Sequence, residues 1–387
     1  MSTNKDQKNR KKAAWNATHH TGELRAEHAQ QEAVLCGWIL RRRDHGRMLF
    51  LDLNSKHGVT QVTCDPDQCL SFEQYEPSLR LGACLSVRGK VLLRTERGGT
   101  PNPKLATGDI EVLATQIHLF SPSKPLPFPL YGETTALEET RLKYRYLDLR
   151  RGPLLDQLQK RSEITYRVRE YFRNQNFVDV ETPCLTKSTP EGARDYLVPS
   201  RVHPERCYAL PQSPQLYKQL LMIGGLERYI QIARCFRDED QRADRQLEFT
   251  QIDFELSFVE VEQIYALVEG LFAHLFQHCL PGQSYTQTFP RLTYEQAMLH
   301  YGEDKPDLRY EVRHQPLNQV FLKSDFRAFS GPAQEGLIKG FCAPQLADRS
   351  RSWLKQKEKL VQRCGAKGLA WCKVSSDSDL ESPIARY

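Results

Sequence analysis

The stretch from Gln212 to Phe258 concentrates side chains that could bind a charged substrate. Two runs rich in strand-forming residues flank a loop, Arg237 to Arg245, that holds three arginines and four acidic residues. This pattern is typical of a long antiparallel hairpin. Polar residues continue into both strands, at Arg234, Gln251, Asp253 and Glu255. Residues two apart share a face of a strand, so such a face lines either water or a polar cleft. A solvated surface hairpin and a binding cleft both fit these residues.

The amino-acid sequence of the hairpin resembles that of a known family. Phe-Arg-Asp-Glu at 236–239, followed by Arg-Gln-Leu-Glu-Phe-Thr-Gln-Ile-Asp at 245–253, resembles motif 2 of the class II aminoacyl-tRNA synthetases, in its bacterial-type aspartyl form. In that family aspartate attacks ATP, and a fixed guanidinium can stabilise the charge that develops on the α-phosphate. The resemblance implies that Arg237 has this catalytic role. It also implies an ATP site of Arg237, Asp238, Glu239 at the adenine amino group, Gln246, and Phe249 stacked on the ring.

Candidate aspartate-binding residues come from three segments. The loop Thr-Pro-Glu-Gly-Ala-Arg-Asp at 189–195 contains glycine and proline, and loops of this kind often close over ligands. A helix is expected to begin near Pro214, which suits a first turn. The resemblance implies contacts to L-aspartate from Glu191, Ser213, Gln215, Lys218 and Asp253. Lys218 would pair with the substrate's side-chain carboxylate and Asp253 with its ammonium, so opposite charges hold the two ends of a zwitterion.

Composition sets broader limits. The chain has 387 residues, a formal net charge of +6 and 40% hydrophobic residues, which predicts more than one domain with ordinary cores. Neither a membrane-spanning run nor a signal peptide is visible. Eleven cysteines without a Cys-x-x-Cys pair favour a reducing cytoplasm over a disulfide framework or structural zinc. Residues 1–18 are polar and basic and are expected to be a disordered tail.

Five strand-like runs follow in the next hundred residues, at 34–43, 48–54, 58–64, 83–93 and 109–119. This number in so short a segment predicts an OB-fold barrel over 19–120, a fold that binds single-stranded nucleic acid. An arginine triplet such as 41–43 can also be a solvated face. Gly-Trp-Ile-x-Arg-Arg-Arg-Asp, however, resembles the anticodon-binding domain of the same family. The resemblance implies that Phe50 stacks on an anticodon base, while Arg43 and Gln61 make polar base contacts.

Residues 121–387 divide into three segments, which are distinguished by their composition and by their resemblance to the same family. Residues 121–140 are proline-rich and are expected to be a hinge. Residues 141–315 resemble the first part of a class II catalytic core, with motif 1 implying a homodimer; an ordinary core helix fits the apolar spacing there equally well. Residues 316–387 resemble part of the insertion domain of bacterial-type members. The expected fold class is therefore α+β and multidomain: an OB barrel, an incomplete class II antiparallel sheet with helices, and a partial α/β insertion.

The resemblance implies an aspartate–tRNA ligase that uses ATP and Mg²⁺ and acylates tRNA(Asp). His45 and the absence of lysine near Gly98 and Gly99 resemble family members that acylate both tRNAs, which implies relaxed specificity that includes tRNA(Asn). A surface histidine without such a role fits His45 equally well. The sequence ends before motif 3 and the magnesium-binding region, so we expect a fragment that does not turn over alone, and its metal ligands are unknown. A non-catalytic tRNA-binding paralogue is the alternative; an asparaginyl or lysyl enzyme fits less well.

Overall fold

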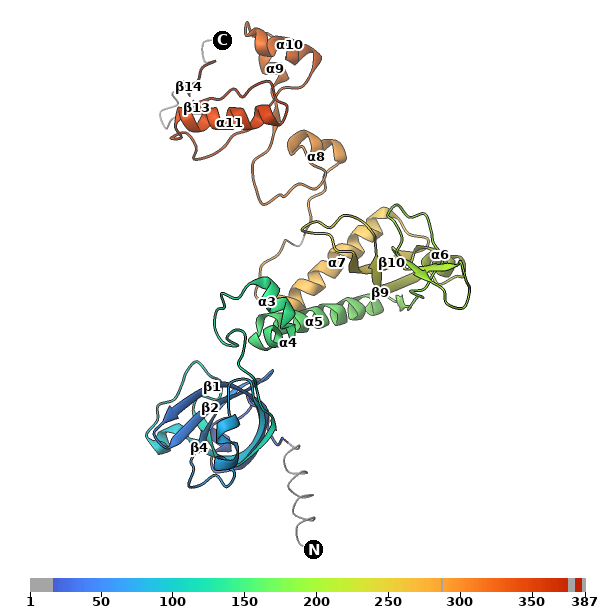
Figure 1. Ribbon diagram of the computed structural model, residues 1–387. Coiled ribbons are helices and arrows are strands. Elements are labelled where there is room, and N and C mark those ends of the chain that lie inside the picture. The colour runs from blue at the N-terminus through green and yellow to red at the C-terminus, as the bar shows by residue number, and fades with distance from the viewer. Residues whose placement is uncertain (1–16, 287, 375–379, 385–387) are drawn as a thin grey trace. The chain divides into compact units, whose positions relative to one another are not determined.

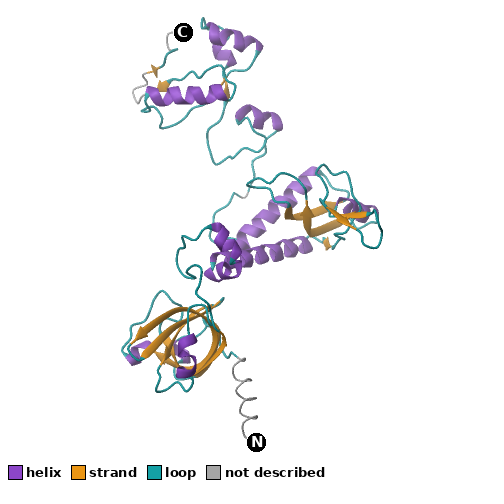
Figure 2. Cartoon of the chain, in the orientation of Figure 1, coloured by secondary structure: helices purple, strands orange, loops and turns teal. Residues whose placement is uncertain are grey.

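The computed structural model describes residues 17–286, 288–374 and 380–384, so most of the predicted basic tail lies outside the described residues. The chain divides into two compact units, Met1–Tyr285 and Thr286–Tyr387. Figure 1 labels the helices and strands, and Figure 2 separates them by type. No helix among the described residues is both long and apolar enough to cross a membrane.

The first unit begins with a closed five-stranded barrel of order β1-β2-β3-β5-β4, which confirms the expected OB fold. Within the barrel, β3 and β5 pair in parallel and the other neighbouring strands pair antiparallel. The strands are β1 (Glu32–His45), β2 (Met48–Ser55), β3 (Gly58–Cys64), β4 (Cys84–Leu93) and β5 (Ile110–Ser121). Short helices lie between them and before them: η1 (Ala26–His28), α2 (Phe72–Tyr75), η2 (Glu76–Ser78) and η3 (Arg94–Arg97).

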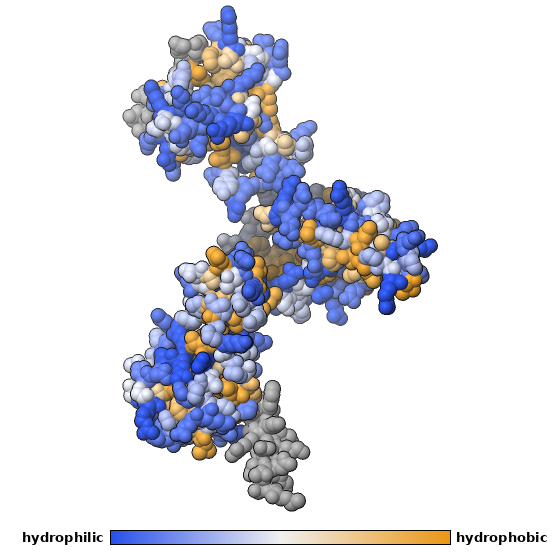
Figure 3. All heavy atoms as spheres, in the orientation of Figure 1, coloured by the Kyte–Doolittle hydropathy of each residue, from blue (hydrophilic) through white to orange (hydrophobic). Residues whose placement is uncertain are grey.

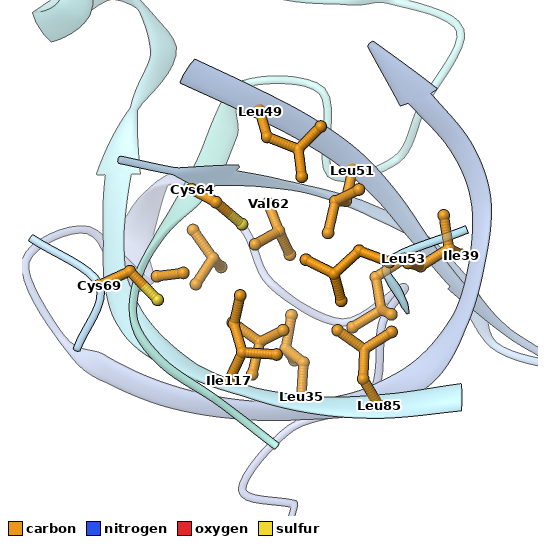
Figure 4. Packing of buried hydrophobic residues seen from close by; sticks show 14 of the residues in the cluster. Leu35, Ile39, Leu49, Leu51, Leu53, Val62, Cys64, Cys69, Leu85 and Ile117 are labelled. Atoms are coloured by element: carbon orange, nitrogen blue, oxygen red, sulfur yellow. The ribbon is translucent and has the colours of Figure 1, made fainter. Parts of the chain in front are cut away.

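Alternation along β2 shows how the barrel forms. Leu49, Leu51 and Leu53 are almost fully buried and belong to the barrel's hydrophobic cluster, and Figure 4 shows them pointing into the interior. Phe50 and Asp52 lie between them on the outer face, because successive side chains of a strand point to opposite sides. The inner face thus supplies the core, and the outer face is left for polar contacts.

The expected hinge packs against the barrel in an ordered way. Phe128, Leu130 and Leu147 form a small buried cluster to which Leu40 of β1 adds a contact. The Arg41 guanidinium lies 3.5 Å from the centroid of the Tyr131 ring. The helices that follow are α3 (Glu138–Lys143), α4 (Arg145–Asp148) and η4 (Leu149–Arg151).

The rest of the first unit is a three-stranded sheet of order β10-β9-β6 covered by two long helices. Its elements are α5 (Pro153–Asn174), β6 (Val178–Asp179), β7 (Leu197–Pro199), β8 (Cys207–Ala209), α6 (Gln215–Ile223), β9 (Arg228–Phe236), β10 (Glu248–Leu256) and α7 (Val261–Cys279). Strands β9 and β10 pair antiparallel over their full length, as the sequence predicts for a hairpin. Val168 and Phe172 of α5 pack with Leu267 of α7 and Ile230 of β9 in one buried cluster.

The second unit has little buried apolar surface among its described residues. Its elements are α8 (Tyr294–His300), β11 (Gln315–Pro316), α9 (Asn318–Phe321), α10 (Arg327–Glu335), β12 (Lys339–Gly340), α11 (Arg351–Arg363), β13 (Lys373–Val374) and β14 (Leu380–Glu381). The buried hydrophobic residues there are Ala297 and Ala333. The strands are two residues long and pair only in twos, β11 with β12 and β13 with β14.

Candidate functional site

The hairpin of β9 and β10 has one apolar face and one polar face. Ile230, Ile232 and Phe254 pack toward α5 and α7. The opposite face therefore carries Gln251, Asp253 and Glu255, as their spacing predicts. Arg234 does not join them: it lies opposite Thr250 in the register and bonds Glu248, Nη1 to Oε1 at 2.7 Å. Its inclusion with the other three was wrong, because an even-numbered position of β9 faces the other way.

A buried ion pair lies at the centre of the polar face. Lys218 of α6 donates to Asp253, Nζ to Oδ1 at 2.9 Å, and its Nζ is 3.3 Å from Glu255 Oε2. Burial lowers the pKa of Lys218, but the hydrogen bond and charge of Asp253, with those of Glu255, outweigh it, so the pKa is raised overall. Asp253 Oδ2 is buried and has no hydrogen-bond partner in the described structure. The pair thus holds a cation and an anion ready for opposite ends of a zwitterion.

The predicted closing loop lies beside the start of α6. Ser213 donates to Glu191, Oγ to Oε2 at 2.8 Å, and Thr189 Oγ1 lies 3.0 Å from Oε1 of the same carboxylate. A cavity of about 120 Å³ lies here, and both Glu191 and Ser213 line it with Leu216 and Tyr217. Gln215 is the first residue of α6 and is half-buried. The structure therefore brings together four of the five predicted aspartate-binding residues in two neighbouring contacts, Glu191 with Ser213 and Lys218 with Asp253.

Gln212 fixes the closing loop, a role that the sequence analysis missed. Its side chain accepts from the Ala193 backbone N–H at 3.0 Å and donates to the Ala193 carbonyl at 2.8 Å and to Asp195 Oδ1 at 2.5 Å. Hydrogen bonds from Gln212 and Ser188 lower the pKa of Asp195. Gln212 lies three residues before the first residue of α6, and its burial, which makes these hydrogen bonds important, is seen only in the structure.

The predicted ATP residues lie in the hairpin loop, which begins directly after β9, and at the start of β10. The Arg237 guanidinium lies 5.0 Å from the centroid of the Phe249 ring, a cation–π distance. Glu239 Oε2 is 3.7 Å from Arg245 Nη1. Asp238 donates its backbone N–H to the carbonyl of Arg194, which joins the closing loop to the hairpin. Gln246 is exposed in the hairpin loop.

The outer face of the barrel carries a connected polar network. Arg43 Nη2 donates to Asp52 Oδ1 at 2.8 Å and to Gln61 Oε1 at 3.1 Å. Gln61 Nε2 in turn donates to Glu111 Oε2 at 2.8 Å, and Thr63 donates to the same oxygen at 2.9 Å. Glu111 was not predicted, although an acidic residue inside the apolar run of β5 is a recognisable signal. The network fixes Arg43 and Gln61 in place while the Arg43 side chain stays 47% exposed.

Phe50 and His45 complete this surface. Phe50 lies opposite Arg43 in the strand register, and the His45 ring meets it edge-on with centroids 5.5 Å apart. Arg42 does not share the surface: it donates to the carbonyls of Glu76 and Leu79, both at 3.1 Å. The three arginines of the triplet thus have different neighbours: Arg41 contacts Tyr131 of the hinge, Arg42 contacts η2, and Arg43 lies beside Phe50.

An OB barrel with a cationic, aromatic outer face, followed by a helix-backed antiparallel hairpin with a charged site, defines the architecture of a class II tRNA synthetase. The chain belongs to that family: the group described as tRNA synthetases class II (D, K and N) matches residues 137–363, and the OB-fold nucleic acid binding domain matches residues 33–120.

Named relatives narrow the similarity further. The chain is 47% identical over 369 residues to an aspartate–tRNA(Asp/Asn) ligase of Thermodesulfovibrio yellowstonii, covering 95% of the chain and 61% of that protein. It is 44% identical over 374 residues to an aspartate–tRNA ligase of Macrococcus caseolyticus, covering 96% of the chain and 62% of that protein. The chain thus spans about three fifths of the length of these relatives.

Solved structures share the fold. An asparaginyl-tRNA synthetase from Pyrococcus horikoshii, complexed with asparaginyl-adenylate, aligns with a TM-score of 0.59 at 21% identity, covering 69% of this chain and 58% of that chain. A putative aspartyl-tRNA synthetase from Leishmania major Friedlin aligns with a TM-score of 0.60 at 21% identity, covering 69% and 54%.

Proposed function

We propose that this chain serves an aspartate–tRNA ligase: it activates L-aspartate with ATP to aspartyl-adenylate and passes the aspartyl group to tRNA(Asp), with tRNA(Asn) as a second acceptor. The observation that carries the proposal is the Lys218–Asp253 pair on the polar face of the hairpin. Aspartate brings one ammonium and an extra carboxylate. Binding it would exchange one internal ion pair for two pairs with the substrate, so no charge is left unpaired.

Arg237 is the catalytic residue of the proposal. Attack of the aspartate carboxylate on the α-phosphate forms the acyl–phosphate bond and breaks the bond to pyrophosphate, and the guanidinium would stabilise the charge on the α-phosphate oxygens. Asp238, Glu239, Gln246 and Phe249 would complete the ATP site, with Phe249 under the adenine. The Arg237–Phe249 contact supports this because it places a cation beside an aromatic platform.

Magnesium has no assigned ligands in the proposal. The family implies that Mg²⁺ accompanies ATP. Among the described residues, however, no group of three or more His, Cys, Asp or Glu side chains is placed to hold a metal ion. Mg²⁺ at nucleotide sites usually takes one or two carboxylates together with the phosphates of the substrate, so a group of three is not required for it to accompany ATP.

The barrel would bind the anticodon, with Phe50 stacking on a base and Arg43 and Gln61 contacting base edges. The hydrogen-bond network through Asp52 and Glu111 supports this role. Because it orders the Arg43 and Gln61 side chains before RNA binds, less conformational entropy is lost on binding. His45 lies against the Phe50 ring, where it could influence which anticodon is accepted.

We also propose a homodimer and a reducing, cytoplasmic location. Leu158, Ile164 and Ile252 are 53%, 41% and 42% exposed on the α5 side of the sheet, and Ile164 and Ile252 line a hollow of about 350 Å³. A second subunit could cover this apolar surface, and sedimentation velocity would test it. All eleven cysteines are free thiols, which supports a reducing compartment.

Aspartate-dependent ATP–pyrophosphate exchange tests the proposed function. Because the relatives are longer, the chain would be assayed alone and joined to the C-terminal part of the Thermodesulfovibrio yellowstonii relative. In the joined protein Arg237→Ala should reduce exchange about 10²- to 10³-fold. Arg234→Ala is the matched control, since it removes an arginine of β9 from the opposite face. Anticodon binding without exchange in the joined protein would favour a non-catalytic tRNA-binding protein.

A further inference from the structure

Positive charge is concentrated in one segment of the second unit. Between Arg349 and Lys373 there are eight lysines and arginines and one acidic residue, Glu358, a net charge of +7. The whole chain carries only +6. This segment of 25 residues therefore holds more net positive charge than the protein that contains it.

Helix α11 arranges four of these cations in a row. Arg351, Lys355, Lys359 and Arg363 follow one another at intervals of four residues from the first position of the helix to the last. Residues four apart are neighbours on a helix surface, so the row runs for about 18 Å along the helix and turns gradually around it, by about 40° at each step. We call these four residues the α11 cationic row. All four are exposed, and Figure 3 shows mostly hydrophilic surface where α11 lies.

Little within the described structure neutralises the row. Arg351 pairs with Glu381, Nη2 to Oε1 at 2.9 Å, but both side chains are more than half exposed. Lys355, Lys359 and Arg363 form no ion pair or hydrogen bond with any residue that the structure describes. Like charges four residues apart repel one another and destabilise a helix. A bound polyanion would turn this repulsion into attraction.

The other side of α11 decides which polyanion fits. Trp353, Leu354 and Val361 are half-buried, and Leu360 is the exposed apolar residue of the helix. The Lys357 ammonium and the Arg349 guanidinium lie 5.0 and 6.0 Å from the Trp353 ring centroid. A helix that binds a membrane surface presents a broad apolar face between its cations. The exposed side of α11 is cationic instead, which suits a phosphodiester backbone.

We propose that the α11 cationic row binds the sugar–phosphate backbone of tRNA at a site separate from the anticodon. The inference rests on the proposed function, which makes tRNA the polyanion. Lysines and arginines along such a row would contact phosphates and add affinity without reading sequence. The row thus assigns a nucleic-acid surface to the second unit, in addition to the Phe50 surface of the barrel.

The salt dependence of binding tests this proposal. The ladder variant, Lys355→Gln with Lys359→Gln and Arg363→Gln, would be compared with the wild-type chain and with a control variant. The control is Lys305→Gln with Lys323→Gln and Arg327→Gln, three exposed residues of the same unit with the same loss of charge. Each protein would be titrated, at several salt concentrations, with whole tRNA(Asp) and with its isolated anticodon stem-loop.

For whole tRNA, the plot of the logarithm of the association constant against log[salt] has a negative slope. The magnitude of this slope should be smaller by about 2 to 3 in the ladder variant, because each phosphate contact contributes about 0.7 to 0.9 to it. The stem-loop slope should not change, and the control should keep the wild-type slope for both RNAs. Two results would overturn this inference and leave the proposed function intact. One is an equal loss of salt dependence in the ladder and control variants, and the other is an unchanged whole-tRNA slope in the ladder variant with normal stem-loop binding. Failure of the wild-type chain to bind either RNA would overturn the proposed function as well.

Discussion

Replacing either member of the Lys218–Asp253 pair should destabilise the hairpin, but by unequal amounts. Lys218→Met removes the cation that contacts two carboxylates, Asp253 and Glu255. Asp253 would remain buried and unpaired, with an oxygen that already lacks a partner. Breaking a buried pair in this way costs about 3–5 kcal/mol. Asp253→Asn leaves Lys218 its contact with Glu255, so its cost should be nearer about 1–3 kcal/mol.

Amide hydrogen exchange of peptides from β9 and β10 measures this difference as a change in local opening free energy. Peptides from the barrel serve as an internal reference and should not change. Lys160→Met, at an exposed position of α5, is the matched control and should stay within about 0.5 kcal/mol of the wild type. Equal losses for Lys218→Met and Asp253→Asn, or a larger loss for Asp253→Asn, would refute the reasoning.

The Lys218–Asp253 pair also makes the stability of the β9–β10 hairpin depend on pH. The folded-state pKa of Lys218 is raised above 10.5. Its contribution to stability is therefore complete below about pH 10.5, where the unfolded chain also binds the proton, and is lost as the pH rises through the folded-state value. Exchange rates in β9 and β10 should show this loss in the wild type and not in Lys218→Met.

Three further predictions concern the barrel and the hairpin. Phe50→Ala should weaken anticodon stem-loop binding by about 1–3 kcal/mol, while Leu70→Ala, at a side chain that is 95% exposed, should not; equal affinities for Phe50→Ala and the wild type would remove Phe50 from the site. Burial and the charge of Asp253 raise the pKa of Cys235 to about 11, so only about 1% of this thiol is thiolate at pH 9. Iodoacetamide should therefore alkylate the exposed Cys184 well before Cys235, as mass spectrometry would show. His45→Leu in the joined protein should reduce charging of tRNA(Asn) more than of tRNA(Asp), whereas a wild-type protein that charges tRNA(Asp) alone would contradict relaxed specificity.

Local pattern was sufficient to predict the five barrel strands, the hairpin and α7. Each has a regular spacing of apolar residues: every second residue along β2, where Leu49, Leu51 and Leu53 alternate with Phe50 and Asp52, and every third or fourth residue along α7. The family resemblance supplied the roles that period alone could not. The structure brings several of those residues into contact, Glu191 with Ser213 and Lys218 with Asp253 among them, but their roles in binding stay predictions.

Long-range polar contacts could not be predicted from period. Arg42 and Arg43 are adjacent and chemically identical, yet Arg42 bonds the carbonyls of Glu76 and Leu79 and Arg43 lies beside Phe50. Glu111 reaches Gln61 across 50 positions of the sequence. These partners depend on which strands meet in the closed barrel, and that information lies in the tertiary structure.

Calorimetric titration of the chain with a non-hydrolysable aspartyl-adenylate analogue tests the central claim most directly, with the asparaginyl-adenylate analogue as comparison. The two ligands differ in whether a carboxylate or an amide faces Lys218. We expect the aspartyl analogue to bind about 10- to 100-fold more tightly, the value of one charged hydrogen bond of about 1.5–3 kcal/mol, and this preference should disappear in Lys218→Met. Equal binding of the two analogues by the wild-type chain, or no binding of either, would contradict the assignment of this face to aspartate.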